Sequence, residues 1–162
     1  MIIIAVIVFV VFIIIAHVFA PKGYSWTADT VSRLADPVHP YAWILRIGMI
    51  SYGIILIAGT RDYSLSSILI AIYGFGVITT GVFTVKKHER IHMFSIYAAG
   101  AALLAAMFRH AITGDIISIL CLVSMISSEL VFNIKYFARW RGLSQRIVHL
   151  SSLIWLAAHG AV

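Results

Sequence analysis

The chain has 162 residues, of which 62% are hydrophobic and only 11% are charged. Soluble domains average about 45–50% apolar and roughly 25% charged residues, so this composition excludes a soluble enzyme, a free nucleic-acid binder and a disordered regulator. In a membrane protein, an excess of basic residues, here a net charge of +6, indicates the orientation of the chain and contact with anionic headgroups. We therefore expect membrane lipid as a partner and no nucleic acid.

A helix needs roughly 20 mainly apolar residues to cross about 30 Å of hydrocarbon. The first such run lacks a basic leading region and is too long for a signal-peptide core, so we take it as a mature span. The prediction is an all-α protein with one transmembrane domain, a polytopic bundle of six helices over residues 1–162. The predicted spans are 2–20, 41–60, 64–84, 92–112, 115–137 and 145–161.

The connection between the first two spans, Pro21 to Pro40, is the longest and holds all three prolines. Thr27 and Asp29 are candidate N-caps, and Ala28, Val31 and Leu34 are spaced for one helical face. This pattern predicts a short amphipathic helix that lies at the headgroup level, with tryptophan and tyrosine residues beside it.

Basic residues are distributed unevenly over the five connections. The second and fourth connections carry only Arg61 and Arg109. The other ten basic residues flank the first, third and fifth connections: Lys22, Arg33, Arg46, Lys86, Lys87, Arg90, Lys135, Arg139, Arg141 and Arg146. The positive-inside rule then predicts a multi-pass protein of the cell membrane with both termini outside.

Small residues indicate where helices approach closely. Ala98, Ala102 and Ala106 recur at four-residue spacing, which predicts a central position for the fourth span. Glycines Gly74, Gly76 and Gly81 predict a close crossing of the third span with a neighbour.

The sequence HERIH, His88 to His92, fits the H-E-x-x-H zinc motif. On a helix, His88 and His92 would share one face and could bind Zn²⁺, while Glu89 could act as the general base on a metal-bound water. A zinc-dependent membrane hydrolase is therefore one alternative. The other interpretation is a charged turn that leads into the fourth helix, because no second motif marks a third ligand.

Glu129 is the only carboxylate well inside a predicted span, and an ionisable residue at membrane depth indicates a functional site. Arg46 lies at about the same predicted depth, as do His17 and His149. We expect Arg46 and Glu129 to form a deep pair, either a structural link between helices or part of a ligand site. Histidines at two levels, His17 with His149 and His110 with His159, also leave open a bis-histidine b-type haem.

Three segments of the chain carry a family resemblance. The first begins at GYSWTADT, with Gly23, Tyr24, Asp29, Thr30, Ser32, Leu34, Gly48 and Gly53 at characteristic places. The second, GVFTVKKHERIH, has Thr84 where proline is usual and His92 as the matching histidine. The third, RGLSQRI, spans Arg141 to Ile147. In these features the chain resembles the domain-of-unknown-function 998 family of small six-helix membrane proteins from archaea and bacteria.

The resemblance implies a fold rather than a reaction, and it implies that His88 and Glu89 lie outside the family pattern. It also implies a site made of Asp29, Ser32, His92, Gln145 and Arg146, which come from the three connections that the charges place on one side. We expect a cytoplasm-facing polar pocket that binds a lipid headgroup or small ligand, with Arg46 and Glu129 deeper. No catalytic constellation or resident cofactor is expected. A homo-oligomer or an accessory subunit of a larger membrane complex is the remaining alternative.

Overall fold

A computed structural model describes residues 1–60 and 62–160. Arg61 and Ala161, which the sequence assigned to a connection and to the end of the last span, lie outside the described residues. Six α-helices and two short 3₁₀ helices make up the fold within this part of the chain. They are α1 Ile2–Val18, η1 Val31–Ala35, α2 Ala42–Gly59, α3 Leu65–Val82, α4 Val85–Ala111, α5 Ile116–Asn133, η2 Lys135–Trp140 and α6 Arg141–His159. The predicted all-α class is confirmed.

Local chemistry explains where several helices begin. The Ser64 side chain accepts a hydrogen bond from the Ser67 N–H at 3.2 Å, and the Asp115 carboxylate accepts one from the Ser118 N–H at 2.7 Å. Each is an N-cap that satisfies a backbone donor at a helix start. Between α4 and α5 the chain reverses at Gly114, whose φ of +85° is a conformation that glycine adopts without strain.

Four helices, α2 to α5, are long and apolar enough to cross a membrane. The α1 helix is entirely apolar except for His17 but has 17 residues, about 26 Å at 1.5 Å per residue. The α6 helix begins with Arg141 and carries Arg146 in its second turn. Large apolar side chains such as Ile7, Phe94 and Leu120 are exposed on the outer surface, which is the surface that lipid would cover.

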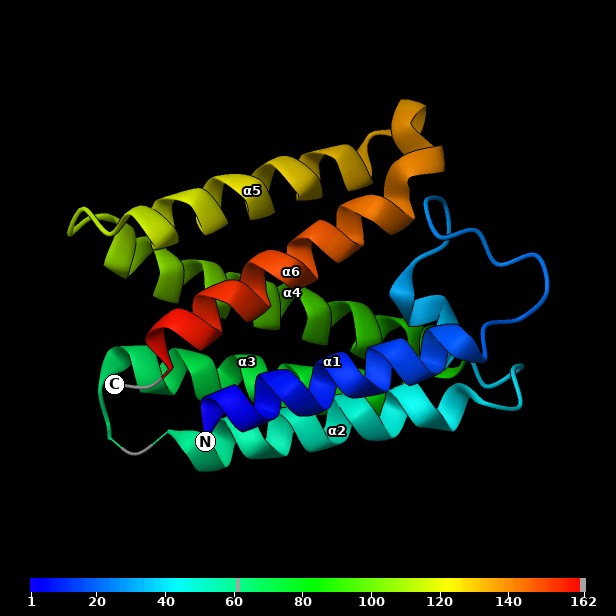
Figure 1. Ribbon diagram of the computed structural model, residues 1–162, viewed down its shortest axis with the longest axis horizontal. Helices are drawn as coiled ribbons and strands as arrows, with labels where there is room; N and C mark the ends of the chain where they lie inside the picture. The colour runs from blue at the N-terminus through cyan, green and yellow to red at the C-terminus, as the bar shows by residue number, and fades with distance from the viewer. Residues whose placement is uncertain (61, 161–162) are drawn as a thin grey trace.

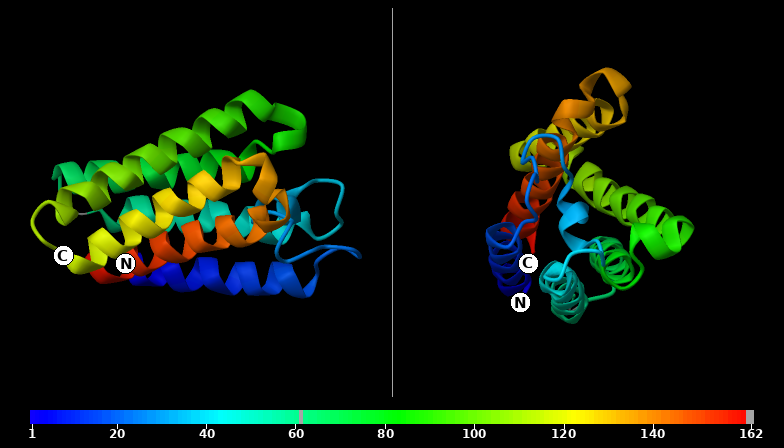
Figure 2. Two further views of the ribbon diagram at one scale, coloured as in Figure 1. Left: turned by 90° about the horizontal axis from the view of Figure 1, so that it is seen from above. Right: turned by 90° about the vertical axis from the view of Figure 1, so that its right-hand side faces the viewer.

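The helices run up and down in chain order and close into a ring, because α1 packs against α6 as well as against α2 (Figure 1). The start of α1 and the end of α6 lie at one end of this ring, which we call the terminal end (Figure 1). The first, third and fifth connections lie at the opposite end, which we call the loop end (Figure 2). The ten basic residues that flank these connections therefore gather at the loop end.

The structure differs from the sequence-based expectation in several details. The α4 helix is not central, since its main neighbours are α3 and α5 and it forms one side of the ring. It begins at Val85 instead of residue 92, with a kink at His88. The predicted interfacial helix is not confirmed: the first connection forms the five-residue η1, and its apolar Val31, Leu34 and Ala35 are buried against the bundle. Their apolar contacts in the protein interior replace the expected contact with lipid.

Close helix approach depends on glycine, as the sequence predicted for α3. A Cβ on Gly74 would lie 3.0 Å from the Gly53 carbonyl oxygen of α2. On the other side of α3, a Cβ on Gly76 would lie 2.6 Å from the Ala99 Cβ and 2.9 Å from the Ser95 carbonyl oxygen of α4. On α4 this contact falls on Ala99 and not on the predicted stripe of Ala98, Ala102 and Ala106, and small residues on both helices let the backbones approach within a membrane.

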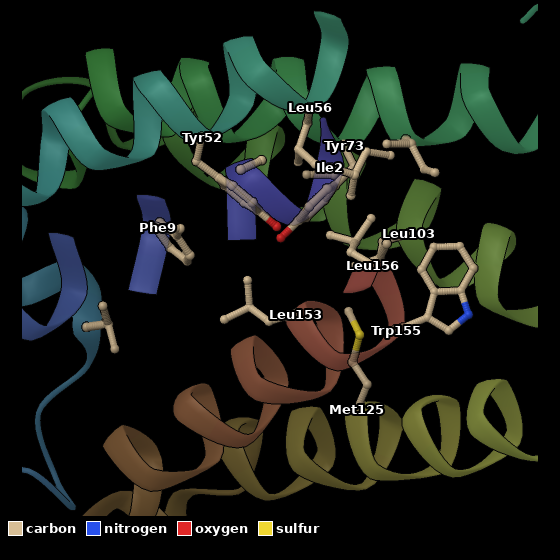
Figure 3. Packing of buried hydrophobic residues seen from close by; sticks show 14 of the residues in the cluster. Ile2, Phe9, Tyr52, Leu56, Tyr73, Leu103, Met125, Leu153, Trp155 and Leu156 are labelled. Carbon is tan, nitrogen blue, oxygen red and sulfur yellow. The ribbon is translucent and has the colours of Figure 1, made fainter. Parts of the chain in front are cut away.

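Buried side chains from several helices fill the middle of the ring. Tyr52 and Tyr73 point toward the same interior region as Leu153 and Met125 (Figure 3). Toward the terminal end, the fully buried Trp155 donates a hydrogen bond from Nε1 to the Ser118 hydroxyl at 2.7 Å, which satisfies its one polar group. The remaining interior space lies nearer the loop end.

We expect Gly76→Ala to destabilise the protein by about 1–3 kcal/mol, because the added methyl has to push α3 and α4 apart. The control is Gly100→Ala in α4, where a Cβ would meet no atom within 4 Å. That variant should gain about 0.5–1 kcal/mol from its better helix propensity. Thermal unfolding in mild detergent measures both, and equal effects would contradict the close α3–α4 contact.

Candidate ligand-binding site

The first connection folds back onto the start of α6 at the loop end. The Gln145 side-chain oxygen accepts a hydrogen bond from the Val31 N–H at 2.6 Å, and the Leu143 N–H donates to the Thr27 carbonyl at 3.0 Å. Gly142 lies against the carbonyl oxygens of Thr27 and Asp29, where a Cβ would not fit. These contacts hold η1 inside the end of the ring (Figure 2).

Arg146 joins α6, α1 and the first connection. Its guanidinium donates to the Tyr24 hydroxyl at 2.6 Å, to the Asp29 carbonyl at 3.1 Å and to His17 Nε2 at 2.8 Å, and it lies 4.4 Å from the centre of the Trp26 ring. A guanidinium can only donate, so His17 Nε2 accepts and its Nδ1–H donates to the Ile13 carbonyl at 2.8 Å. Arg146 is thus a structural link.

Asp29 organises the connection from within. Its carboxylate accepts a hydrogen bond from the Ser25 N–H at 2.7 Å and forms an ion pair with Arg33. The Ser25 hydrogen bond, followed by the contact with Arg33, lowers the pKa of the Asp29 carboxyl below its usual value. At Tyr24 the dominant cause is burial, which raises the pKa of the phenol. Asp29 and Tyr24 both stabilise the conformation of the first connection.

A cavity of about 130 Å³ lies within the ring on the loop side, and we call it the inner cavity. Every one of the six helices and η1 contributes to its lining. Most of the lining is apolar, including Phe9, Leu45, Met49, Leu103 and Met125. The polar lining residues are Ser32, Tyr73, Thr80, His92, Glu129, Gln145, His149 and Ser152.

A second and more polar space of about 400 Å³ adjoins the inner cavity at the loop end, and we call it the vestibule. Four residues line both spaces: Ser32, Met49, Thr80 and His92. The other residues of the vestibule are Thr30, Arg33, Ala35, Asp36, Thr84, Val85 and Lys86. The two spaces therefore lie next to each other, with these four residues at the border between the polar end of the bundle and its apolar interior.

His92 lies where the two spaces meet. Its side chain is 3% exposed, and its Nδ1 lies 2.7 Å from the Phe83 carbonyl oxygen. The other ring nitrogen, Nε2, is buried without a hydrogen-bond partner among the described residues. The Thr84 hydroxyl, also on the vestibule, is buried and lacks a partner within the same part of the chain. Buried polar atoms without partners are rare and need an explanation.

The structure brings together four of the seven predicted ligand-binding residues, since Ser32, His92, Gln145 and Glu129 all line the inner cavity. Asp29 and Arg146 lie beside it and fasten the first connection. Residues that sequence reasoning missed, such as Thr80 and Tyr73, lack a distinguishing motif, and their inward direction follows only from how α3 is rotated.

The predicted pair of Arg46 and Glu129 is wrong. The Arg46 guanidinium instead donates to the carbonyls of Gly81 and Val82 at 2.9 and 3.3 Å, at the end of α3. The free carbonyls of a helix end attract a cation. Glu129 forms no ion pair with any described residue. Arg46 and Glu129 lie at similar predicted depths but are not in contact, because α2 and α5 lie on different sides of the ring.

The zinc motif does not have the helical geometry that its spacing predicted. His88 has φ −142° and ψ 54°, so the helix is interrupted between the two histidines. His88 and Glu89 are exposed, whereas His92 is buried against Phe83. Across residues 1–60 and 62–160, no group of three His, Cys, Asp or Glu side chains could hold a metal ion.

The histidine pairs considered for haem make other contacts. The rings of His110 and His159 meet edge to face, with centroids 4.9 Å apart, and His159 Nε2 lies 2.9 Å from the Asp115 carboxylate. This contact leaves no room for a porphyrin between the two rings. At the loop end, His17 accepts a hydrogen bond from Arg146, whereas His149 lines the inner cavity.

A ring of apolar helices, with its basic residues gathered at one end around a buried space, defines a helical membrane protein with an interior cavity. The chain belongs to the family described as "Protein of unknown function (DUF998)", which matches residues 3–162 and confirms the resemblance seen in the sequence. No curated protein and no solved structure matches the chain.

We expect Arg146→Lys to loosen the first connection, because an ammonium cannot reproduce the forked contacts to Tyr24, His17 and Asp29. Hydrogen bonds to charged groups contribute about 1.5–3 kcal/mol each, so amide hydrogen exchange in residues 24–35 should accelerate at least tenfold. The exposed Arg139→Lys, at the same end, is the control. Unchanged protection in Arg146→Lys would contradict the linking role.

Acid should loosen the same segment through Asp29. Because the pKa of Asp29 is lowered in the folded protein, its ionised form stabilises the loop above the ordinary value of 3.8, and this stabilisation is lost as pH falls below it. The protection factors of amides 24–35, which compare their exchange with that of an unfolded chain at the same pH, should therefore fall between about pH 5 and pH 3. Asp29→Asn should already show faster exchange at pH 5 and a smaller change on acidification. An equal pH response in both proteins would contradict this role.

Proposed function

We propose that this chain is an integral membrane protein that binds an amphipathic ligand, with the polar part of the ligand in the vestibule and its apolar part in the inner cavity. The observation that carries the proposal is the shared lining: Ser32, Thr80 and His92 border a polar space on one side and an apolar space on the other. Two adjacent spaces of this polarity match an amphiphile better than a wholly polar solute.

The lining supports this assignment. The inner cavity is bordered mainly by side chains such as Phe9, Leu45 and Met125, which favour hydrocarbon. The vestibule has charged Arg33, Asp36 and Lys86 on its border. Polar atoms of a ligand would keep hydrogen-bonding partners there while the apolar part leaves water.

The size of the inner cavity limits the ligand. An apolar cavity of roughly 150 Å³ in another protein holds one benzene molecule, and about 130 Å³ is similar. The cavity therefore accepts one ring or the end of one chain and excludes a pair of acyl chains. We propose a single-chain ligand, or a lipid that inserts only one of its chains.

The charge distribution supports an orientation for this site. The loop end carries ten of the twelve Lys and Arg residues, and the positive-inside rule assigns such an end to the cytoplasm. The vestibule would then open at the level of the inner-leaflet headgroups. Ligand would enter from that leaflet, beneath η1 and the first connection.

Filling the inner cavity should abolish binding. Gly100 lines the cavity, and a Cβ at this position would meet no atom within 4 Å, so Gly100→Leu places a side chain in the open space without a backbone clash. Ala101, the next residue of α4, is exposed on the outer surface. Ala101→Leu is therefore the matched control.

The probe is a ten-carbon alcohol with a diazirine near the end of its chain, used with the full chain in phosphatidylcholine nanodiscs. After illumination, mass spectrometry should locate label on cavity residues such as Leu103 and Met125 in the native protein and in Ala101→Leu. We expect at least a tenfold loss of this label in Gly100→Leu, since a cavity of this size holds no second group. Equal labelling in all three proteins would overturn the proposal.

A further inference from the structure

The protonation of His92 follows from its contact with Phe83. A carbonyl oxygen can only accept a hydrogen bond, so His92 Nδ1, 2.7 Å from it, carries the proton. In the uncharged imidazole the other nitrogen, Nε2, is then an acceptor. This acceptor is buried at the junction of the inner cavity and the vestibule and has no partner among the described residues.

Two other groups that line the inner cavity also offer lone pairs. The Thr80 hydroxyl, which lines both spaces, donates its proton to the Val77 carbonyl at 2.8 Å, so its oxygen faces its surroundings as an acceptor. Glu129 adds a carboxylate to the lining of the inner cavity. These three groups favour a hydrogen-bond donor and disfavour an anion in the cavity.

The Thr84 hydroxyl adds the complementary requirement. It is 6% exposed, borders the vestibule and has no partner in the described part of the chain. A threonine hydroxyl can donate as well as accept. A ligand group that donates to His92 at the junction and can also accept a hydrogen bond from the vestibule side would therefore suit this site, and a hydroxyl is the smallest group that does both.

The vestibule is not a simple anion site. Arg33 forms an ion pair with Asp29, and Asp36 borders the same space. Among the described residues on its border, the other Lys or Arg is Lys86, which is exposed. The positive charge at the loop end is thus partly offset where a ligand head would lie.

We infer that the ligand is an uncharged, hydroxyl-bearing amphiphile whose hydroxyl lies at the junction of its chain and head and donates a hydrogen bond to His92 Nε2. This inference rests on the proposed function and specifies the ligand class of that same site. This class includes long-chain alcohols. It also includes uncharged glycerol lipids in which a free hydroxyl lies beside the attachment point of a single chain.

Competition against the diazirine alcohol tests the inference with the native chain in phosphatidylcholine nanodiscs. The competitors are 1-decanol, its methyl ether and decanoate, which share one chain length and differ in the head. We expect 1-decanol to displace the label at a concentration about tenfold lower than either of the others, because only it donates to a buried acceptor without adding charge. Equal potency of alcohol and ether, or stronger competition by decanoate, would overturn the inference.

A variant and a spectroscopic signal locate the effect at His92. His92→Phe preserves a ring of similar size, so the alcohol should lose its advantage over the ether, while the exposed His88→Phe in the same helix should keep it. In protein labelled with ¹⁵N-histidine, 1-decanol should move the Nε2 resonance of His92 upfield, and the ether should not. This signal comes from the native protein and needs no variant to fold.

The outcomes distinguish failure of the proposed amphiphile site from failure of the hydroxyl specificity. If the ether binds the inner cavity as well as the alcohol and Gly100→Leu blocks both, the amphiphile site stands and the hydroxyl specificity is wrong. If none of the three competitors displaces the label, the proposed function fails, and this inference fails with it.

Discussion

The attachment of the first connection to α6 is the constraint on which the loop end of this protein depends. Arg146 contacts His17, Tyr24 and Asp29, while Gln145 holds the backbone of Val31. Together with the burial of Val31, Leu34 and Ala35, these contacts hold η1 inside the ring, where Val31 and Ser32 line the inner cavity. A single cation with five donors thus orders a segment that is otherwise rich in proline and turns.

The membrane environment explains why the polar side chains at this end of the protein are paired. In hydrocarbon, polar groups must find partners within the protein, and most do so here: Trp155 with Ser118, Arg46 with the end of α3, and His17 with Arg146. Four buried polar atoms lack a partner among the described residues: Tyr52 Oη, Thr84 Oγ1, His92 Nε2 and Arg146 Nε. Of these, the atoms of Thr84 and His92 belong to residues that line the vestibule. The proposed ligand would supply what the protein itself does not.

Sequence reasoning succeeded where one residue type has one physical consequence. Apolar runs predicted helices, and glycines in α3 predicted a close crossing. It failed where an outcome depends on rotation about a helix axis. Arg46 and Glu129 have matching depths but different neighbours, and the kink at His88 cannot be read from H-E-x-x-H spacing.

The sequence by itself determined that this chain is a helical membrane protein of its family and that one end of it is basic. The length of an apolar run and the number of charges in a connection can be counted along the chain without knowing its fold. Only the tertiary structure decided which polar groups share a space. Ser32, His92, Glu129 and Gln145 come from four segments, and their meeting at one cavity depends on how six helices rotate and on η1 turning inward. Those choices follow from packing at close range, which no local pattern records.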